Sequence, residues 1–161
     1  ELPRLLDWCG ARGFDLTLIE SMPMGEVGDC RAKHFMSLDE ARTTLEAHTR
    51  LTPSDHRTGG PARYFDVAGT GTRVGFIAPY SHNFCEACNR VRLTCTGMLY
   101  LCLGQDDSAD LRQPLRDGAS DAELRRVILD AIARKPRGHD FDETRLTDGA
   151  QVVRFMNTTG G

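Results

Sequence analysis

Three cysteines, Cys85, Cys88 and Cys102, follow the pattern C-x2-C-x13-C and limit what this chain can fold into. The first two are close enough to bind one metal centre from a tight turn, and the third has to return to them from a later strand. Thiolates are the soft ligands that iron–sulfur clusters and zinc select, so the spacing indicates a metal site. A C-x2-C pair also occurs in redox-active dithiols and in structural zinc sites. The cysteines alone therefore do not identify the metal.

The residues directly after Cys88 add a second chemical property to this region. Residues 89–93 read N-R-V-R-L, and in an extended segment Arg90 and Arg92 project from one face while Val91 projects from the other. Two guanidinium groups beside a metal centre can bind phosphate bidentately. The alternative is that both arginines belong to an ordinary exposed face of a strand.

Composition restricts the class of protein. The 161 residues suit one domain, or one domain and a piece of another, and a hydrophobic content of 40% suffices for a core. The net charge of −3, without a basic tail, argues against nucleic acid as the main partner. No apolar run reaches membrane-spanning length and no signal peptide is visible, so we expect a soluble cytoplasmic protein without membrane contact. Six unevenly spaced cysteines favour a metal site in a reducing compartment over a disulfide scaffold.

The first 25 residues are predicted to form one αβ step. Apolar residues at helical spacing predict a helix over 2–12, and Gly13 can end it. Residues 14–19 predict a strand, and a loop rich in Met and Pro follows. Such a step belongs to a parallel sheet or barrel, in which the loops after the strands carry function. Met22 and Met24 lie in this loop, where the simpler interpretation is that they fill irregular space.

Two capping boxes predict helices further along the chain. Ser37 with Glu40 begins a helix that runs to about residue 48, and Ser120 with Glu123 begins one that Lys135-Pro136 ends. Three short strands are expected to pair in one small antiparallel sheet. Two of them form a hairpin, and the third carries Cys102. These strands are residues 62–67, 73–78 and 98–103. Residues 51–62 and 105–118 are expected to be loops, and 152–155 a weak strand.

Together these motifs resemble the carboxy-terminal half of the molybdenum-cofactor biosynthesis protein A family, whose members are radical S-adenosylmethionine GTP cyclases. Residues 18–23, L-I-E-S-M-P, are similar to the family's sixth barrel strand and following loop, so the resemblance extends over nearly the whole chain. The other matching motifs are C-x2-C-N-R-V-R-L at 85–93, Gly97, Cys102, Leu111-Arg112, the Lys135…His139-x-Phe141 segment and the terminal Gly160-Gly161.

The resemblance implies an enzyme with two clusters. In the family, an amino-terminal C-x3-C-x2-C motif holds a 4Fe-4S cluster that cleaves S-adenosylmethionine to a deoxyadenosyl radical. The radical takes hydrogen from the 3′ carbon of the GTP ribose, and that carbon then bonds to carbon 8 of guanine. A second 4Fe-4S cluster holds the GTP. Carried over by position, Cys85, Cys88 and Cys102 would ligate this second cluster, Arg90, Val91 and Arg92 would line the GTP site, and Met22 would contact S-adenosylmethionine.

The resemblance also implies an α/β plus α+β fold. Residues 1–30 would be the last αβ unit of an incomplete TIM-type radical-SAM barrel, and residues 31–161 a carboxy-terminal α+β region that contains a small antiparallel sheet and binds substrate. The chain begins without methionine and contains no C-x3-C-x2-C, so we expect a fragment that lacks the amino-terminal half of the barrel and is inactive alone. The strand at 14–19 would then lack its parallel neighbour, and residues 1–30 could exchange between copies in a homodimer. The resemblance also implies a functional link to cyclic pyranopterin monophosphate synthase, the enzyme that acts in the step after the cyclase.

A structural zinc-binding module is the alternative function. Zinc would need a fourth ligand, which His82 or Cys95 could supply, so that the site would hold three cysteines and one histidine or four cysteines. Cys9, Cys30 and Cys95 match no ligand position of the family, and we expect them to be small buried thiols. Thr17 stands where many family members have an arginine, which puts one phosphate contact in doubt.

Overall fold

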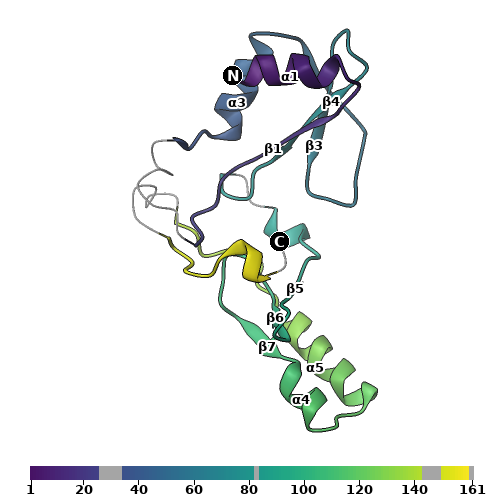
Figure 1. The fold of residues 1–161 in the computed structure, drawn as a ribbon, viewed down its shortest axis with the longest axis vertical. Coiled ribbons are helices and arrows are strands. Elements are labelled where there is room, and N and C mark those ends of the chain that lie inside the picture. Colours follow the sequence, from purple (N-terminus) through teal and green to yellow (C-terminus); the bar gives the residue numbers. More distant parts are fainter. Residues whose placement is uncertain (26–33, 82–83, 143–149, 160–161) are drawn as a thin grey trace. The chain divides into compact units, whose positions relative to one another are not determined.

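The chain forms two compact units, each with a small sheet of its own. A computed structural model describes residues 1–25, 34–81, 84–142 and 150–159 (Figure 1). The first unit takes its described residues from 1–22 and 34–84, and the second takes them from 23–25 and 85–159. The chain therefore enters the second unit, returns to the first and enters the second again.

A four-stranded sheet in the order β1-β4-β3-β2 organises the first unit. Its strands are β1 (Leu16–Ile19), β2 (Leu51–Pro53), β3 (Arg63–Val67) and β4 (Arg73–Ile77). β1 runs parallel to β4, whereas β3 is antiparallel to both β4 and β2. The expectation that the strand at 14–19 would lack a parallel neighbour is therefore wrong, because β4 supplies one.

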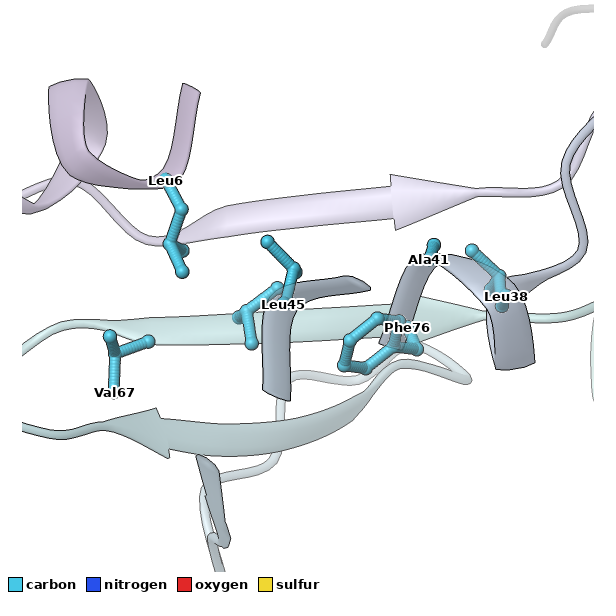
Figure 2. Packing of buried hydrophobic residues seen from close by; sticks show 7 residues of the cluster. Leu6, Leu38, Ala41, Leu45, Val67 and Phe76 are labelled. Carbon is cyan, nitrogen blue, oxygen red and sulfur yellow. The ribbon is translucent and has the colours of Figure 1, made fainter. Parts of the chain in front are cut away.

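Two helices cover this sheet, α1 (Leu2–Gly10) and α3 (Leu38–Glu46). The predicted capping box is confirmed, since the Ser37 hydroxyl accepts from the Glu40 N–H and the Glu40 carboxylate accepts from the Ser37 N–H. Figure 2 shows side chains from both helices pointing toward those of the strands. The buried cluster comprises Leu6 of α1, Leu38, Ala41 and Leu45 of α3, Val67 of β3, and Val74 and Phe76 of β4.

A three-stranded antiparallel sheet, in the order β5-β6-β7, organises the second unit. Its strands are β5 (Arg92–Leu93), β6 (Met98–Tyr100) and β7 (Ser108–Asp110). Two helices follow, α4 (Arg112–Arg116) and α5 (Asp121–Ala133), the second begun by the predicted Ser120 capping box. Leu99, Leu101, Leu111 and Ala131 form the buried centre between this sheet and α5.

The mixed α/β class with a small antiparallel sheet is confirmed, but the predicted pairing of three strands in one sheet is wrong. The hairpin of β3 and β4 belongs to the first sheet, and the segment that leads to Cys102 pairs with β5 and β7 in the second. The expected loops at 51–62 and 105–118 contain β2, β7 and α4, three elements of only three, three and five residues. The weak strand at 152–155 is reduced to one parallel bridge between Met24 and Val152, before a short 3-10 helix at Met156–Thr159.

Among the described residues, no helix combines the length and the apolar character needed to cross a membrane.

Candidate functional site

The first two thiols of the candidate site lie on one tight turn. Cys85–Ala87 form a single turn of 3-10 helix, and the Cys88 N–H donates to the Cys85 carbonyl oxygen at 3.0 Å. Both cysteines are half-buried. The turn predicted from the C-x2-C spacing is therefore present.

The second sheet brings Cys102 back toward this turn. Cys102 follows β6, and the adjacent Leu101 N–H donates to the Asp107 carbonyl at 3.2 Å, at the base of the connection to β7. Burial raises the pKa of the Cys85 thiol above its ordinary value of 9.0, and the negative charges of Cys102 and Cys88 raise it further. Cys102 thus acts electrostatically on Cys85, although seventeen positions separate them in the sequence.

The segment after α5 contacts both thiol-bearing stretches. The backbone N–H of His139 donates a hydrogen bond to the Cys85 sulfur, and this bond and the positive charge of Lys135 both oppose the rise in the pKa of Cys85. Lys135 Nζ donates to the Leu101 carbonyl at 2.7 Å. The segment therefore supplies a hydrogen-bond donor to the first thiol and positive charge beside the loop of the third.

Close packing holds this segment against the loop that follows Cys102. A Cβ added to Gly104 would lie 2.8 Å from the His139 Cβ and 2.9 Å from the Phe141 Cε2, so this position has room for glycine alone. The His139 Nδ1 accepts from the Phe141 N–H at 3.2 Å, which places the ring proton on Nε2 in the neutral form. Nε2 is buried and has no hydrogen-bond partner among the described residues.

The chemistry of this donor set fits an iron–sulfur cluster. The negative charges of Cys102 and Cys88 disfavour ionisation of Cys85, and positive charge placed beside these thiols would relieve that repulsion. Sulfur donors of this kind, with hydrogen bonds to the sulfur, are the ones that iron–sulfur clusters take. In the described part of the chain, no three His, Cys, Asp or Glu side chains already form a group that could hold a metal ion.

Arg90 and Arg92 lie on the segment that links the thiol turn to the second sheet. Both are half-buried, whereas Val91 and Leu93 are exposed, with 36% and 57% of their surfaces accessible. The predicted alternation is present, but the charged residues form its more buried side. Arg92 lies opposite Tyr100 in the β5–β6 register. Tyr100 precedes Cys102 by two positions.

Arg154 belongs to the same region and was missed by the sequence interpretation. Its guanidinium carbon lies 4.1 Å from the centre of the Tyr100 ring, and only 10% of its side chain is exposed. Arg154 is remote in sequence from the ring and loop that it contacts, so no local pattern could reveal its position.

The remaining predicted positions divide into three groups. Met22 is half-buried in the first unit, while Met24 is buried at 8% exposure and pairs with Val152, which confirms the space-filling interpretation for Met24. Cys9 is a buried free thiol as predicted, whereas Cys95 is exposed in the turn between β5 and β6, contrary to the expectation. Cys30, His82 and Gly160-Gly161 lie outside the described residues.

Residues 14–141 match a family model described as Molybdenum Cofactor Synthesis C. The chain belongs to this family. The matched range includes the three thiols, the two arginines and the segment from Lys135 to Phe141. The Molybdenum Cofactor Synthesis C match thus covers the whole candidate site except Arg154.

Relatives of this Molybdenum Cofactor Synthesis C chain carry the name GTP 3′,8-cyclase. It is 58% identical over 161 residues to the GTP 3′,8-cyclase of Sinorhizobium medicae, and 57% identical over 162 residues to that of Paracoccus denitrificans. The GTP 3′,8-cyclase of Brucella canis is 53% identical over 161 residues. All of this chain is covered in each comparison, but only 46%, 47% and 47% of the respective relatives. The chain therefore spans about half the length of the relatives it matches.

Proposed function

We propose that this chain is the GTP-binding part of a GTP 3′,8-cyclase, and that it carries the second 4Fe-4S cluster of that enzyme. The whole protein would be a radical S-adenosylmethionine lyase that makes cyclic dihydroguanosine triphosphate, in the first step of molybdenum cofactor biosynthesis. Cyclic pyranopterin monophosphate synthase would act on that product. The observation that carries this proposal is that Cys85 and Cys88 share one tight turn, where the charge of Cys102 acts on Cys85. The names of the family and of its relatives support the reaction class.

In this proposal the chain's own residues divide the work of holding GTP. Cys85, Cys88 and Cys102 would ligate three irons of the cluster, which when bound would supply a fourth iron open to the guanine base. Arg90 and Arg92 would bind the triphosphate through their guanidinium groups. The exposed Val91 between them would contact the nucleoside. The half-buried position of both arginines supports this role, because partly shielded charges attract phosphate more strongly than fully hydrated ones.

We also propose that residues 1–30 complete a barrel in the whole enzyme. The helix-then-strand order of α1 and β1 supports this assignment, as does the position of β1 at the edge of its sheet. Ile19, the last residue of β1, is 60% exposed, and Phe14, which precedes the strand, is 52% exposed. A further strand and helix at this edge of the sheet would bury these large apolar side chains. Met22, in the loop after β1, would contact S-adenosylmethionine.

Metal analysis after anaerobic reconstitution with iron and sulfide tests the proposed cluster. We expect iron and sulfide in the ratio of a 4Fe-4S cluster, with broad visible absorption. Cys85→Ala, Cys88→Ala and Cys102→Ala should each lose most of this iron. Cys95→Ala is the matched control, since its thiol is exposed in the neighbouring turn, and it should keep the iron of the parent.

Two results would overturn this proposal. Stoichiometric zinc in place of iron in air-protected protein would favour the structural zinc module. Equal loss of metal in Cys95→Ala and in Cys102→Ala would indicate a closed site with four protein ligands rather than an open cluster.

A further inference from the structure

Cationic side chains bind the peptide carbonyls on both sides of Cys102. Lys135 Nζ donates to the Leu101 carbonyl at 2.7 Å, and Arg154 Nη2 donates to the Leu103 carbonyl at 3.0 Å. Lys135 follows α5, whereas Arg154 lies near the carboxy terminus, so two separate parts of the chain meet at one loop.

Arg154 makes further contacts with this loop. The same Nη2 donates to the Gln105 carbonyl at 2.7 Å, and Nη1 forms an ion pair with the Asp106 carboxylate. The aromatic ring of Tyr100, on β6, lies against the guanidinium. A buried guanidinium is costly unless its donors are satisfied, and here most of them are satisfied by residues 103–106. The burial of Arg154 thus depends on the shape of this loop, and the shape of the loop depends on Arg154.

Lys135 is held in place by the end of α5. Its backbone N–H donates to the Ile132 carbonyl at 3.0 Å, which continues the helical turn and fixes the root of the side chain. Lys135 therefore restrains the backbone directly before Cys102.

We propose that Lys135 and Arg154 are positioning residues that fix the loop of Cys102 for metal ligation. The loop between β6 and β7 spans residues 101–107. The hydrogen bond from the Leu101 N–H to the Asp107 carbonyl closes the base of this loop. The carbonyls at 101, 103 and 105 instead bind the two cations, so these side chains replace strand pairing as the source of order. A thiol held by an ordered loop loses less conformational entropy when it binds a metal. The part of this inference that concerns the metal rests on the proposed function.

Hydrogen exchange of metal-free protein, followed by mass spectrometry, tests the positioning role. The variants are Lys135→Met and Arg154→Met, with Arg125→Met as the control, since Arg125 is exposed on α5. We expect residues 101–107 to exchange about tenfold faster or more in the first two variants, which is the effect of losing one charge-assisted hydrogen bond. The control should match the parent. Peptides from residues 121–128 of α5, which lies in the same unit as the loop, serve as the internal reference for general destabilisation and should not change.

Conservative variants separate positioning from simple loss of packing. Lys135→Arg can still donate to the Leu101 carbonyl and should restore most of the protection. Arg154→Lys keeps the charge but cannot bind both carbonyls and Asp106 at once, so it should give intermediate exchange. After anaerobic reconstitution, both methionine variants should release iron to a chelator faster than the parent and the Arg125→Met control.

Different results would overturn the positioning role and the proposed function. Unchanged exchange of residues 101–107 in both methionine variants would disprove the positioning role. Acceleration of the α5 peptides by the same factor would also disprove it, because the effect would then be general instability of the second unit. Failure of the parent itself to take up iron, together with a local change at 101–107, would disprove the proposed cluster but support the role of both cations.

Discussion

Ser81 donates two hydrogen bonds to the buried carboxylate of Glu20, from its hydroxyl to Oε1 at 2.5 Å and from its backbone N–H to Oε2 at 3.0 Å. The Leu38 N–H donates to Oε1 at 3.1 Å and the Tyr80 N–H to Oε2 at 3.3 Å. Glu20 thus joins the end of β1, the start of α3 and the segment after β4. Cys85 follows four residues after Ser81 in the sequence.

Glu20→Gln should destabilise the first unit by about 2 kcal/mol, because the glutamine amide can accept hydrogen bonds through only one of its two terminal atoms. At least one buried N–H would then lose its acceptor. Urea unfolding checks the change, with Asp130→Asn as a control that removes an exposed carboxylate from α5. A loss of stability no larger than that of the control would show that the four contacts contribute little.

Gly104→Ala should destabilise the second unit by about 1–3 kcal/mol, since its Cβ would overlap the Cβ of His139 and the ring of Phe141. The His139 backbone cannot yield by a simple side-chain rotation. Gly138→Ala is the matched control, because a Cβ at Gly138 meets no atom within 4 Å. Thermal unfolding of both variants measures the difference. Equal midpoints would show that the loop at Gly104 relaxes without cost.

Arg90→Ala and Arg92→Ala should each weaken GTP binding to the cluster-loaded protein by roughly tenfold to a hundredfold, the range for loss of a charge-assisted contact with phosphate. Isothermal titration calorimetry measures the affinity. Arg125→Ala is the control for a general change in charge. If both variants bind GTP as tightly as the parent, the arginine assignment is wrong.

Protonation of Glu123 should weaken the capping box at the start of α5. The Ser120 N–H and then its hydroxyl, by hydrogen bonding the carboxylate, lower the pKa of Glu123 below its ordinary value of 4.5. A carboxyl whose pKa is lowered in the folded state adds stability at pH values above its ordinary pKa. This stability disappears as the pH falls through the folded-state pKa. The free energy of unfolding of Glu123→Gln should therefore lie below that of the parent at neutral pH and approach it in acid. A difference that stays constant with pH would contradict the role of the charge.

Local features of the fold could be predicted from the sequence because their causes are local. Each capping box needs only a serine and a glutamate three positions apart, and both were found where predicted. The turn at Cys85–Ala87 likewise follows from short spacing. Pairing between distant segments was harder to predict, because a strand of three residues such as β7 carries little signal of its own. Its place is set by the register Leu99 opposite Ala109.

Part of the candidate site depends on contacts that no spacing reveals. The thiols and arginines form a compact motif, so they could be proposed from the sequence. Arg154 reaches residues 48–51 positions away, and its role depends on where the carboxy-terminal segment runs. Lys135 was noted only as part of a motif and a helix end, although its ammonium binds the carbonyl next to Cys102.

The bridge between Met24 and Val152 limits how the chain can be divided experimentally. Gly25 N–H donates to the Val152 carbonyl at 2.9 Å, and the Gln151 and Val152 N–H groups both donate to the Pro23 carbonyl. A truncation that starts at Cys85 would remove residues 23–25, to which three backbone groups of the carboxy-terminal segment are hydrogen bonded. Since Arg154 follows two residues after Val152, the cut would also loosen the anchor of its guanidinium. Residues 23–25 should therefore be retained, for example through a linker, in any shortened version meant to keep the thiol loop intact.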